Sequence, residues 1–195
     1  VGARFSHRER CRGKPVLVIG GGGREHAIVD ALSRSPQVSK IYCAPGNAGI
    51  GLKAFNVALK DTDVEGLKNF ALDNQVDLTV VGPEAALAAG LTDAFRAAGL
   101  AVFGHTKAAT AIESSKEFAK RLMEKYGIPT ASYQAFSDYG EALAYVSGRP
   151  FPAVLKYDGL AAGKGVVIAQ DLEEAKAALA SMLLDEAFGK GRVVG

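Results

Sequence analysis

The stretch VLVIGGGGREHA, residues 16–27, decides how the first part of the chain folds. The apolar run at 16–19 predicts a buried strand, and the residues behind it predict a glycine turn that opens a helix. Backbone N–H groups in such a turn point to the helix N-terminus, which attracts anions. Arg24 stands where a second phosphate contact is useful. The stretch therefore favours a phosphate site, and the alternative is a tight turn whose glycines only permit close packing.

A dinucleotide-binding site would need the spacing G-x-G-x-x-G at this turn. Glu25 occupies the third glycine position in one alignment and His26 occupies it in the other. The acidic residue that binds ribose in such sites is also missing after the next strand, where Cys43, Ala44 and Pro45 stand. Both differences argue against nicotinamide or flavin binding, and so against a nucleotide-linked oxidoreductase.

Short β-rich runs alternate with helical segments from Pro15 onward, which is typical of βαβ units on a parallel sheet. A capping box at Thr62 and Glu65 predicts one helix start. Strands are predicted at 16–19, 40–43, 77–81 and 100–103, and one helical face at Leu87, Leu91, Ala94 and Phe95. The pattern predicts an α/β domain over residues 15–104 with a doubly wound parallel sheet.

A second helical segment follows this domain. Ser114 and Glu117 form a capping box, and Gly127 and Pro129 end the helix, so residues 105–130 are predicted to be a helical linker. A small α+β unit is predicted over 131–195, with strands at 132–136, 152–157 and 166–169 and helices at 138–146 and from 171 onward. Val193 resembles the start of a further strand, and we expect the chain to be a piece of a longer protein.

The first 14 residues differ from the rest, because they are rich in arginine and hold a single acidic residue, Glu9. We interpret residues 1–14 as a disordered arm or a cloning remnant. The end of an organelle transit peptide is a second interpretation, and a phosphate-binding arm is a third.

Composition narrows the function classes. The net charge of +2 and the scattered basic residues argue against nucleic acid as a partner. No apolar run reaches the roughly 20 residues that cross a bilayer, so we expect no membrane partner. Cys11 and Cys43 lack the spacing of a metal site, and we expect free thiols in the cytoplasm, or in an organelle if the arm is a transit peptide.

Two further loops follow predicted strands: APGNAG at 44–49 and VGPEAALAAG at 81–90. Ligands of open α/β sheets bind beyond the carboxyl ends of the strands, so these loops and the glycine turn are predicted to line one pocket. Turn chemistry is the alternative role for Asn47 and Pro83, whereas Glu84 is expected to meet a ligand amine or hydroxyl. The predicted substrate-phosphate residues are Gly21, Gly22, Gly23, Arg24, Glu25, Gly46, Asn47, Gly82, Pro83 and Glu84.

The stretch KYDGLAAGKGVVIA, residues 156–169, places a glycine-rich loop with two lysines between two strands. Such a loop can fold over a polyphosphate through its N–H groups and ammonium charges. It is not a P-loop, because a strand follows and Gly165 replaces the serine or threonine. The alternative is a β-hairpin turn enriched in glycine. The candidate polyphosphate residues here are Lys156, Asp158, Gly159, Leu160, Ala161, Ala162, Gly163, Lys164 and Gly165.

These motifs, in this order and spacing, resemble the N-terminal half of the glycinamide ribonucleotide synthetase family of ATP-grasp ligases. The resemblance implies that the first three loops help to bind phosphoribosylamine. It also implies that Lys116 and Lys156 contact ATP phosphate and that the DGLAAGKGV loop covers the triphosphate. His105, Ser114 and Tyr157 depart from the usual family pattern, and Tyr157 is expected to alter how tightly the loop closes.

The resemblance further implies an ATP- and Mg²⁺-dependent ligase, a monomer, that joins glycine to phosphoribosylamine through a glycyl phosphate in purine biosynthesis. No catalytic or metal-binding residue is assigned within this sequence, because the family carries its magnesium ligands in a C-terminal half that we expect to be absent. The fragment alone is therefore expected to be inactive. The alternatives are another ATP-grasp carboxylate–amine ligase and a noncatalytic phosphate-binding module.

Overall fold

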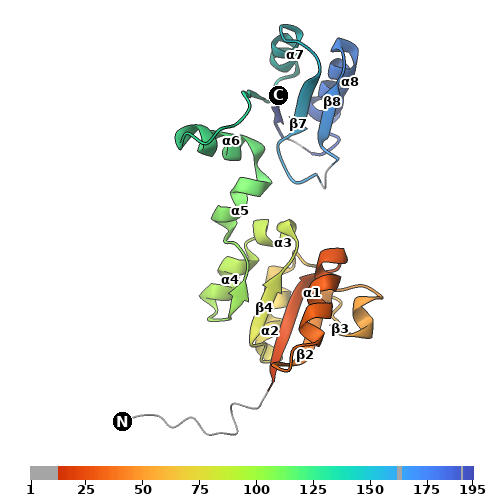
Figure 1. Ribbon diagram of the computed structural model, residues 1–195, viewed down its shortest axis with the longest axis vertical. Coiled ribbons are helices and arrows are strands. Elements are labelled where there is room, and N and C mark those ends of the chain that lie inside the picture. The colour runs from red at the N-terminus through yellow and green to blue at the C-terminus, as the bar shows by residue number, and fades with distance from the viewer. Residues whose placement is uncertain (1–12, 162–163, 190) are drawn as a thin grey trace. The chain divides into compact units, whose positions relative to one another are not determined.

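A computed structural model describes residues 13–161, 164–189 and 191–195, and the chain forms two compact units divided after Thr110 (Figure 1). Nearly all of the predicted N-terminal arm lies outside the described residues, as do Ala162 and Gly163 of the glycine-rich loop. Within the described part of the chain, no helix is both long and apolar enough to span a membrane.

The first unit contains a five-stranded parallel sheet with the order β3-β2-β1-β4-β5 (Figure 1). Its strands are β1 (Lys14–Gly20), β2 (Val38–Pro45), β3 (Phe55–Asn56), β4 (Leu78–Val81) and β5 (Val102–Phe103). The predicted parallel sheet is confirmed. β3 was not predicted, and β5 is shorter than the predicted strand at 100–103 because only two of those residues pair with β4.

Helices cover both faces of this sheet, which makes it doubly wound as predicted. Along β1, Leu17 and Ile19 pack into one core cluster while Val18 packs into another on the opposite face. The helical elements of this unit are α1 (Gly23–Ser33), the 3-10 helix η2 (Ile50–Leu52), α2 (Val64–Asp73), α3 (Glu84–Ala88) and α4 (Leu91–Ala97). Residues of α1 and η2 join the cluster around Val18, and residues of α2, α3 and α4 join the other.

Two helix boundaries in this unit differ from the sequence prediction. Asp63, rather than Thr62, caps α2, because its side chain accepts a hydrogen bond of 3.0 Å from the Gly66 N–H. The single helical face predicted across 87–95 belongs to two helices, since Gly90 adopts a left-handed conformation with φ of 90° between them. Leu87, Leu91 and Phe95 are nevertheless buried in the same cluster.

Two helices, α5 (Lys107–Ser114) and α6 (Lys116–Lys125), are formed where one linker helix was predicted, and the boundary between the units falls within α5. Ser115 separates them with an extended backbone and caps α6 by accepting a hydrogen bond from the Phe118 N–H, so the cap lies one residue after the predicted Ser114, and Phe118 rather than Glu117 stands at the third helical position. A four-stranded antiparallel sheet follows, with the order β6-β9-β7-β8. The elements are β6 (Ala135–Phe136), α7 (Tyr139–Ser147), β7 (Ala153–Tyr157), β8 (Val166–Ala169), α8 (Leu172–Leu183) and β9 (Val193–Val194).

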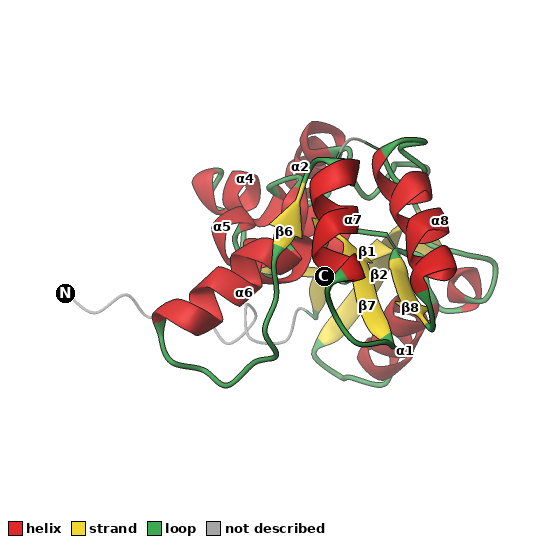
Figure 2. Cartoon of the chain, turned by 90° about the horizontal axis from the view of Figure 1, so that it is seen from above, coloured by secondary structure: helices red, strands yellow, loops and turns green. Residues whose placement is uncertain are grey.

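The core of the second unit lies between this sheet and the neighbouring helices α7 and α8 (Figure 2). Leu155, Leu179 and Val193 are fully or almost fully buried there. The strand predicted at Val193 is confirmed, and it lies inside the sheet, between β6 and β7. The strand predicted at 132–136 is reduced to its last two residues, because only Ala135 and Phe136 pair with β9.

Two phenylalanines of the first unit offer a matched test of its core. Phe95 is fully buried, whereas Phe103 is 72% exposed. We expect Phe95→Ala to lower the free energy of unfolding by about 3 to 5 kcal/mol, because it leaves a cavity. Phe103→Ala should change it by no more than about 0.5 kcal/mol. Urea denaturation of both variants measures this, and equal losses would contradict the assigned core.

Candidate functional site

Three loops meet at the carboxyl edge of the parallel sheet, as the sequence predicted. The glycine turn after β1 is bound to the loop after β2, because the Gly46 N–H donates to the Gly20 carbonyl over 3.1 Å. The loop after β4 joins them, since the Gly82 N–H donates to the Ile19 carbonyl over 3.1 Å. The structure thus brings together most of the residues predicted to bind a substrate phosphate.

Glu25 lies beneath this edge and is only 4% exposed. Its carboxylate accepts a hydrogen bond of 2.7 Å from the Gly22 N–H at the start of α1. A Cβ at Gly82 would overlap the carboxylate, and one at Gly20 would lie 2.6 Å from its Cγ. The glycines therefore make room for a buried carboxylate, which already occupies part of the helix N-terminus. Direct contact between Glu25 and a phosphate stays a prediction, and the negative charge opposes it.

Arg24 links the glycine turn to the loop after β4. It donates to Glu25 over 3.0 Å and to Glu84 over 3.0 Å. The hydrogen bond with Glu84 raises the pKa of Arg24 and lowers the pKa of Glu84. The side chains of Arg24 and Glu84 are 54% and 41% exposed, so water weakens this ion pair. An arriving phosphate can therefore compete with Glu84 for the guanidinium at small cost.

The Asn47 side chain stabilises the loop after β2, in which it lies. Its side-chain amide donates to the Gly21 carbonyl over 2.8 Å and accepts from the Ile50 N–H over 2.9 Å. Both ends of the amide are therefore engaged within the protein, which supports turn chemistry as its role. Its predicted contact with a phosphate is not tested by this geometry.

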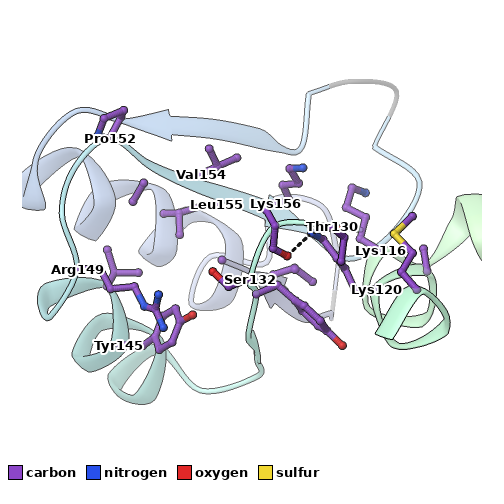
Figure 3. Close-up of a pocket in the computed structure, with 18 of the residues that line it drawn as sticks. Lys116, Lys120, Thr130, Ser132, Tyr145, Arg149, Pro152, Val154, Leu155 and Lys156 are labelled. Atoms are coloured by element: carbon purple, nitrogen blue, oxygen red, sulfur yellow. Dashed lines mark hydrogen bonds between the residues drawn. The ribbon is translucent and has the colours of Figure 1, made fainter. Parts of the chain in front are cut away.

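The second unit holds a cavity of about 600 Å³ (Figure 3). Lys116 from the first position of α6 and Lys156 from β7 both line it. The structure thus brings together two residues 40 positions apart that were predicted to bind the same polyphosphate. The remaining lining comes from α6, the loop that follows it, the end of α7, the loop between α7 and β7, β7 itself, and the end of β9 with the residue after it: Ala119, Lys120, Met123, Thr130, Ala131, Ser132, Tyr133, Tyr145, Val146, Arg149, Pro150, Pro152, Ala153, Val154, Leu155, Val194 and Gly195.

Alternation along β7 separates its two faces. Leu155 and Tyr157 point into the core, whereas Val154 and Lys156 lie on the other face. Their partners on β8 in the sheet register are Ile168 and Val166, which are 57% and 42% exposed. An apolar sheet surface beside ammonium groups suits a ligand that has a flat apolar part and an anionic part.

The glycine-rich loop connects β7 to β8 as a β-hairpin, since the two strands pair antiparallel with Lys156 opposite Val166. Both predicted roles, the polyphosphate loop and the hairpin turn, are compatible with this geometry. Tyr157 packs beneath the loop, because a Cβ at Gly159 would lie 2.7 Å from its ring. The Tyr157 hydroxyl donates to the Gly189 carbonyl over 3.3 Å, which fixes the hydroxyl end of the ring.

Lys120 and Arg149 line the cavity, and neither was predicted. Lys120 donates to the Thr130 hydroxyl over 2.7 Å and to the Ala131 carbonyl over 2.9 Å. These bonds tie the loop that follows α6 to the helix. Arg149 stacks on Tyr145 at 4.0 Å from the ring centre, at the end of the cavity away from Lys116 (Figure 3). Lys120 follows Lys116 by four residues, a spacing that places both on one helix face and could have identified it.

A metal centre is not formed by the described ranges 13–161, 164–189 and 191–195. In them, no three or more His, Cys, Asp or Glu side chains are grouped so that they could hold an ion.

The glycine turn lies on a parallel sheet and the lysine-bearing hairpin on a small antiparallel sheet, and the part of the chain that carries the hairpin, residues 114–194, matches an ATP-grasp (A) domain. Solved structures share this fold. The biotin carboxylase domain of 2-oxoglutarate carboxylase from Hydrogenobacter thermophilus matches 93% of this chain and 43% of its own, with a TM-score of 0.72 and 16% identity.

Comparison with protein families gives a more specific assignment than the shared fold does. Residues 14–113 match the N domain of phosphoribosylglycinamide synthetase, and residues 114–194 match its ATP-grasp (A) domain. The chain belongs to the phosphoribosylglycinamide synthetase family.

Relatives in this family are similar over most of the chain. A phosphoribosylamine–glycine ligase from Caldanaerobacter subterraneus is 53% identical over 174 residues, which are 89% of this chain and 42% of the relative. The crystal structure of a phosphoribosylamine–glycine ligase from Thermotoga maritima matches 92% of this chain and 42% of its own, with a TM-score of 0.72 and 31% identity. The chain therefore spans about 42% of the length of these relatives.

A pair of glycines tests the packing around Glu25. Gly82→Ala should displace the Glu25 carboxylate and lower the free energy of unfolding by roughly 1 to 3 kcal/mol, because a buried charge loses its partners. Gly23→Ala is the matched control, since a Cβ there meets nothing within 4 Å. Thermal denaturation of both variants measures the difference. Equal stability of the two variants would contradict this role for Gly82.

Proposed function

We propose that this chain forms the phosphoribosylamine-binding region and part of the ATP-binding region of a phosphoribosylamine–glycine ligase. In the proposed reaction, a glycine carboxylate oxygen attacks the γ-phosphorus of ATP, and ADP leaves. The amine of phosphoribosylamine then attacks the carbonyl carbon of glycyl phosphate, and inorganic phosphate leaves as the amide forms. The observation that carries the proposal is the placement of Lys116 and Lys156 in one cavity beside the glycine-rich loop.

The two lysines neutralise charge in this mechanism. Phosphoryl transfer is accelerated mainly by positioning and by cations near the phosphate oxygens, so no nucleophilic side chain is required. Lys156 is fixed by the pairing of β7 with β8 and β9, and Lys116 by the start of α6. Both ammonium groups are therefore carried by regular structure, which favours a defined phosphate position.

The apolar surface formed by Val154, Val166 and Ile168 suits the adenine ring. Burial of these partly exposed side chains under a flat ring would remove apolar area from water. A carboxyaminoimidazole ribonucleotide synthase from Aspergillus, whose fold this chain shares at a TM-score of 0.71, was solved in complex with ATP, which supports the proposed binding of a nucleotide.

The carboxyl edge of the parallel sheet is the proposed site for the phosphoribosyl substrate. Arg24 and the N–H groups at the start of α1 supply phosphate donors, and Glu84 supplies an acceptor for an amine or hydroxyl. Magnesium would enter with the phosphates of ATP, and no step is assigned to side-chain ligands in the described part of this chain. The proposed enzyme acts as a monomer in the cytoplasm.

A second candidate is another ATP-grasp carboxylate–amine ligase, because solved carboxyaminoimidazole ribonucleotide synthases share the fold at 16–19% identity. A third is a noncatalytic phosphate-binding module, because the chain spans about 42% of its relatives. Titration with ATP and with a phosphoribosyl ligand, combined with a phosphate-release assay, separates these. A module binds without releasing phosphate, and a different ligase releases phosphate without requiring glycine.

Lys156→Ala tests the ATP site. In a full-length version of the protein, we expect ATP binding or turnover to weaken more than tenfold, or by over about 1.4 kcal/mol, because a phosphate loses its cation. Lys176→Ala is the control, since that lysine lies on α8 and pairs only with the exposed Glu173 among the described ion pairs. Steady-state kinetics with ATP varied measures both, and unchanged kinetics of Lys156→Ala would refute the role.

The 195-residue chain itself is predicted not to complete the reaction, because it covers less than half of the relatives' length. A coupled assay for ADP on the purified chain tests this, with the full-length version as the positive control. Robust turnover by the 195-residue chain would overturn the prediction.

A further inference from the structure

The Asp158 carboxylate, at the entrance of the glycine-rich loop, contacts the first turn of α6. It accepts hydrogen bonds from the Ser115 hydroxyl over 3.1 Å, from the Glu117 N–H over 3.1 Å and from the Lys116 N–H. These donors come from three consecutive residues that lie more than 40 positions away in sequence. A carboxylate that accepts three hydrogen bonds from its own protein is a strong and directional link.

This link is not needed to start the helix. The Ser115 hydroxyl already accepts a hydrogen bond of 3.0 Å from the Phe118 N–H, which is an ordinary local cap. Asp158 adds a long-range connection on top of the local one. The Asp158 carboxylate therefore fixes the position of the first turn of α6 relative to the glycine-rich loop.

The side chain of Lys116 makes a further contact between α6 and the glycine-rich loop. Its ammonium donates to the Gly159 carbonyl over 2.9 Å. Asp158 and Gly159 are neighbours, so the backbone and the side chain of Lys116 are both tied to the loop entrance. The Gly159 carbonyl is a neutral acceptor, and a phosphate oxygen is a stronger partner for an ammonium group.

A second brace supports the first turn of α6. The Arg192 guanidinium donates to the Glu117 carboxylate over 2.7 Å and 2.9 Å and to the Ala135 carbonyl over 3.2 Å. The Arg192 carbonyl accepts from the Asp158 N–H over 2.7 Å. The backbone of Asp158 is therefore held by the segment before β9, which makes the carboxylate a fixed anchor.

We infer that Asp158 is a positioning residue, which acts on ATP through Lys116 and does not contact the nucleotide. The inference rests on the proposed ATP site. Both carboxylate oxygens accept from α6, and a carboxylate that faces a triphosphate would repel it. Asp158 also neutralises the positive end of α6, so the triphosphate is held by the Lys116 side chain rather than by the helix N-terminus. This role replaces the direct ATP contact expected for Asp158 from its motif.

A double-mutant cycle tests the inference. ATP affinity is measured by calorimetry on the full-length protein as wild type, Asp158→Ala, Lys116→Ala and the double variant. We expect each single change to weaken binding about tenfold, and the double variant to be within about twofold of Lys116→Ala, because contacts in one network are not additive. A loss of about a hundredfold in the double variant would show independent action and overturn the inference, as would wild-type affinity in Asp158→Ala.

Two further variants separate positioning from general damage. Asp158→Asn keeps an acceptor oxygen for the α6 N–H groups, so its affinity should stay within about threefold of wild type. Asp171→Ala removes the cap of α8, where Asp171 accepts from the Glu174 N–H over 2.9 Å, and should lower stability without weakening ATP binding. Equal losses of affinity in Asp171→Ala and Asp158→Ala would overturn the inference. Asp158→Ser enters the cycle if Asp158→Ala does not fold.

The same data distinguish this inference from the proposed function. If the wild-type protein binds no ATP, the proposed ATP site is wrong and the inference falls with it. If the wild type binds ATP and Lys116→Ala weakens it, while Asp158→Ala adds its full loss in the double variant, only the inference is wrong.

Discussion

Strand β1 has a hydrogen-bonded parallel neighbour on each side, and the rest of the first unit depends on this arrangement. Val18 lies opposite Cys43 of β2 and opposite Val80 of β4, so the three strands run in register. Because they are parallel, their carboxyl ends reach the same edge, and the loops that follow them have to meet. The proposed substrate site is therefore a consequence of strand pairing. The glycines at this edge then decide what fits beneath it, which is the buried Glu25 carboxylate.

The second unit is built on an antiparallel sheet, in which strands from distant parts of the chain lie side by side. β7 and β8 form a hairpin, and β9, the last strand in the chain, pairs with the edge of β7 that faces away from β8. This pairing brings Arg192 to Glu117 and brings its carbonyl to Asp158. Lys116 and Lys120 of α6 and Lys156 of β7 line one cavity, although the helix contributes no buried residue of its own. Long-range polar contacts, more than apolar burial, hold α6 in place.

The two sites use charge in different ways. At the edge of the parallel sheet, Arg24 is shared between Glu25 and Glu84, and solvent exposure leaves the outer pair weak enough to exchange. In the second unit, Asp158 and Glu117 engage α6 and Arg192, while Lys116 rests on a neutral carbonyl. In both places the cation proposed to bind phosphate has a partner that a phosphate can replace. A polar site can be ordered before its ligand arrives in this way, without a permanently unsatisfied charge.

The sequence by itself determined the parallel sheet of the first unit, the small α+β unit, the glycine turn and the lysine-bearing loop between two strands, because strand and helix periodicity and glycine spacing are local signals. It also pointed to Arg24, Lys116 and Lys156 through motifs and resemblance. Tertiary structure alone decided that Glu25 is buried beneath the glycines and that Asp158 faces α6, since both depend on residues brought together from distant segments. It also decided the exact helix starts at Asp63 and Ser115, where neighbouring residues offer competing caps. Local propensity cannot choose between such neighbours, because the choice is made by packing that a sequence pattern does not contain.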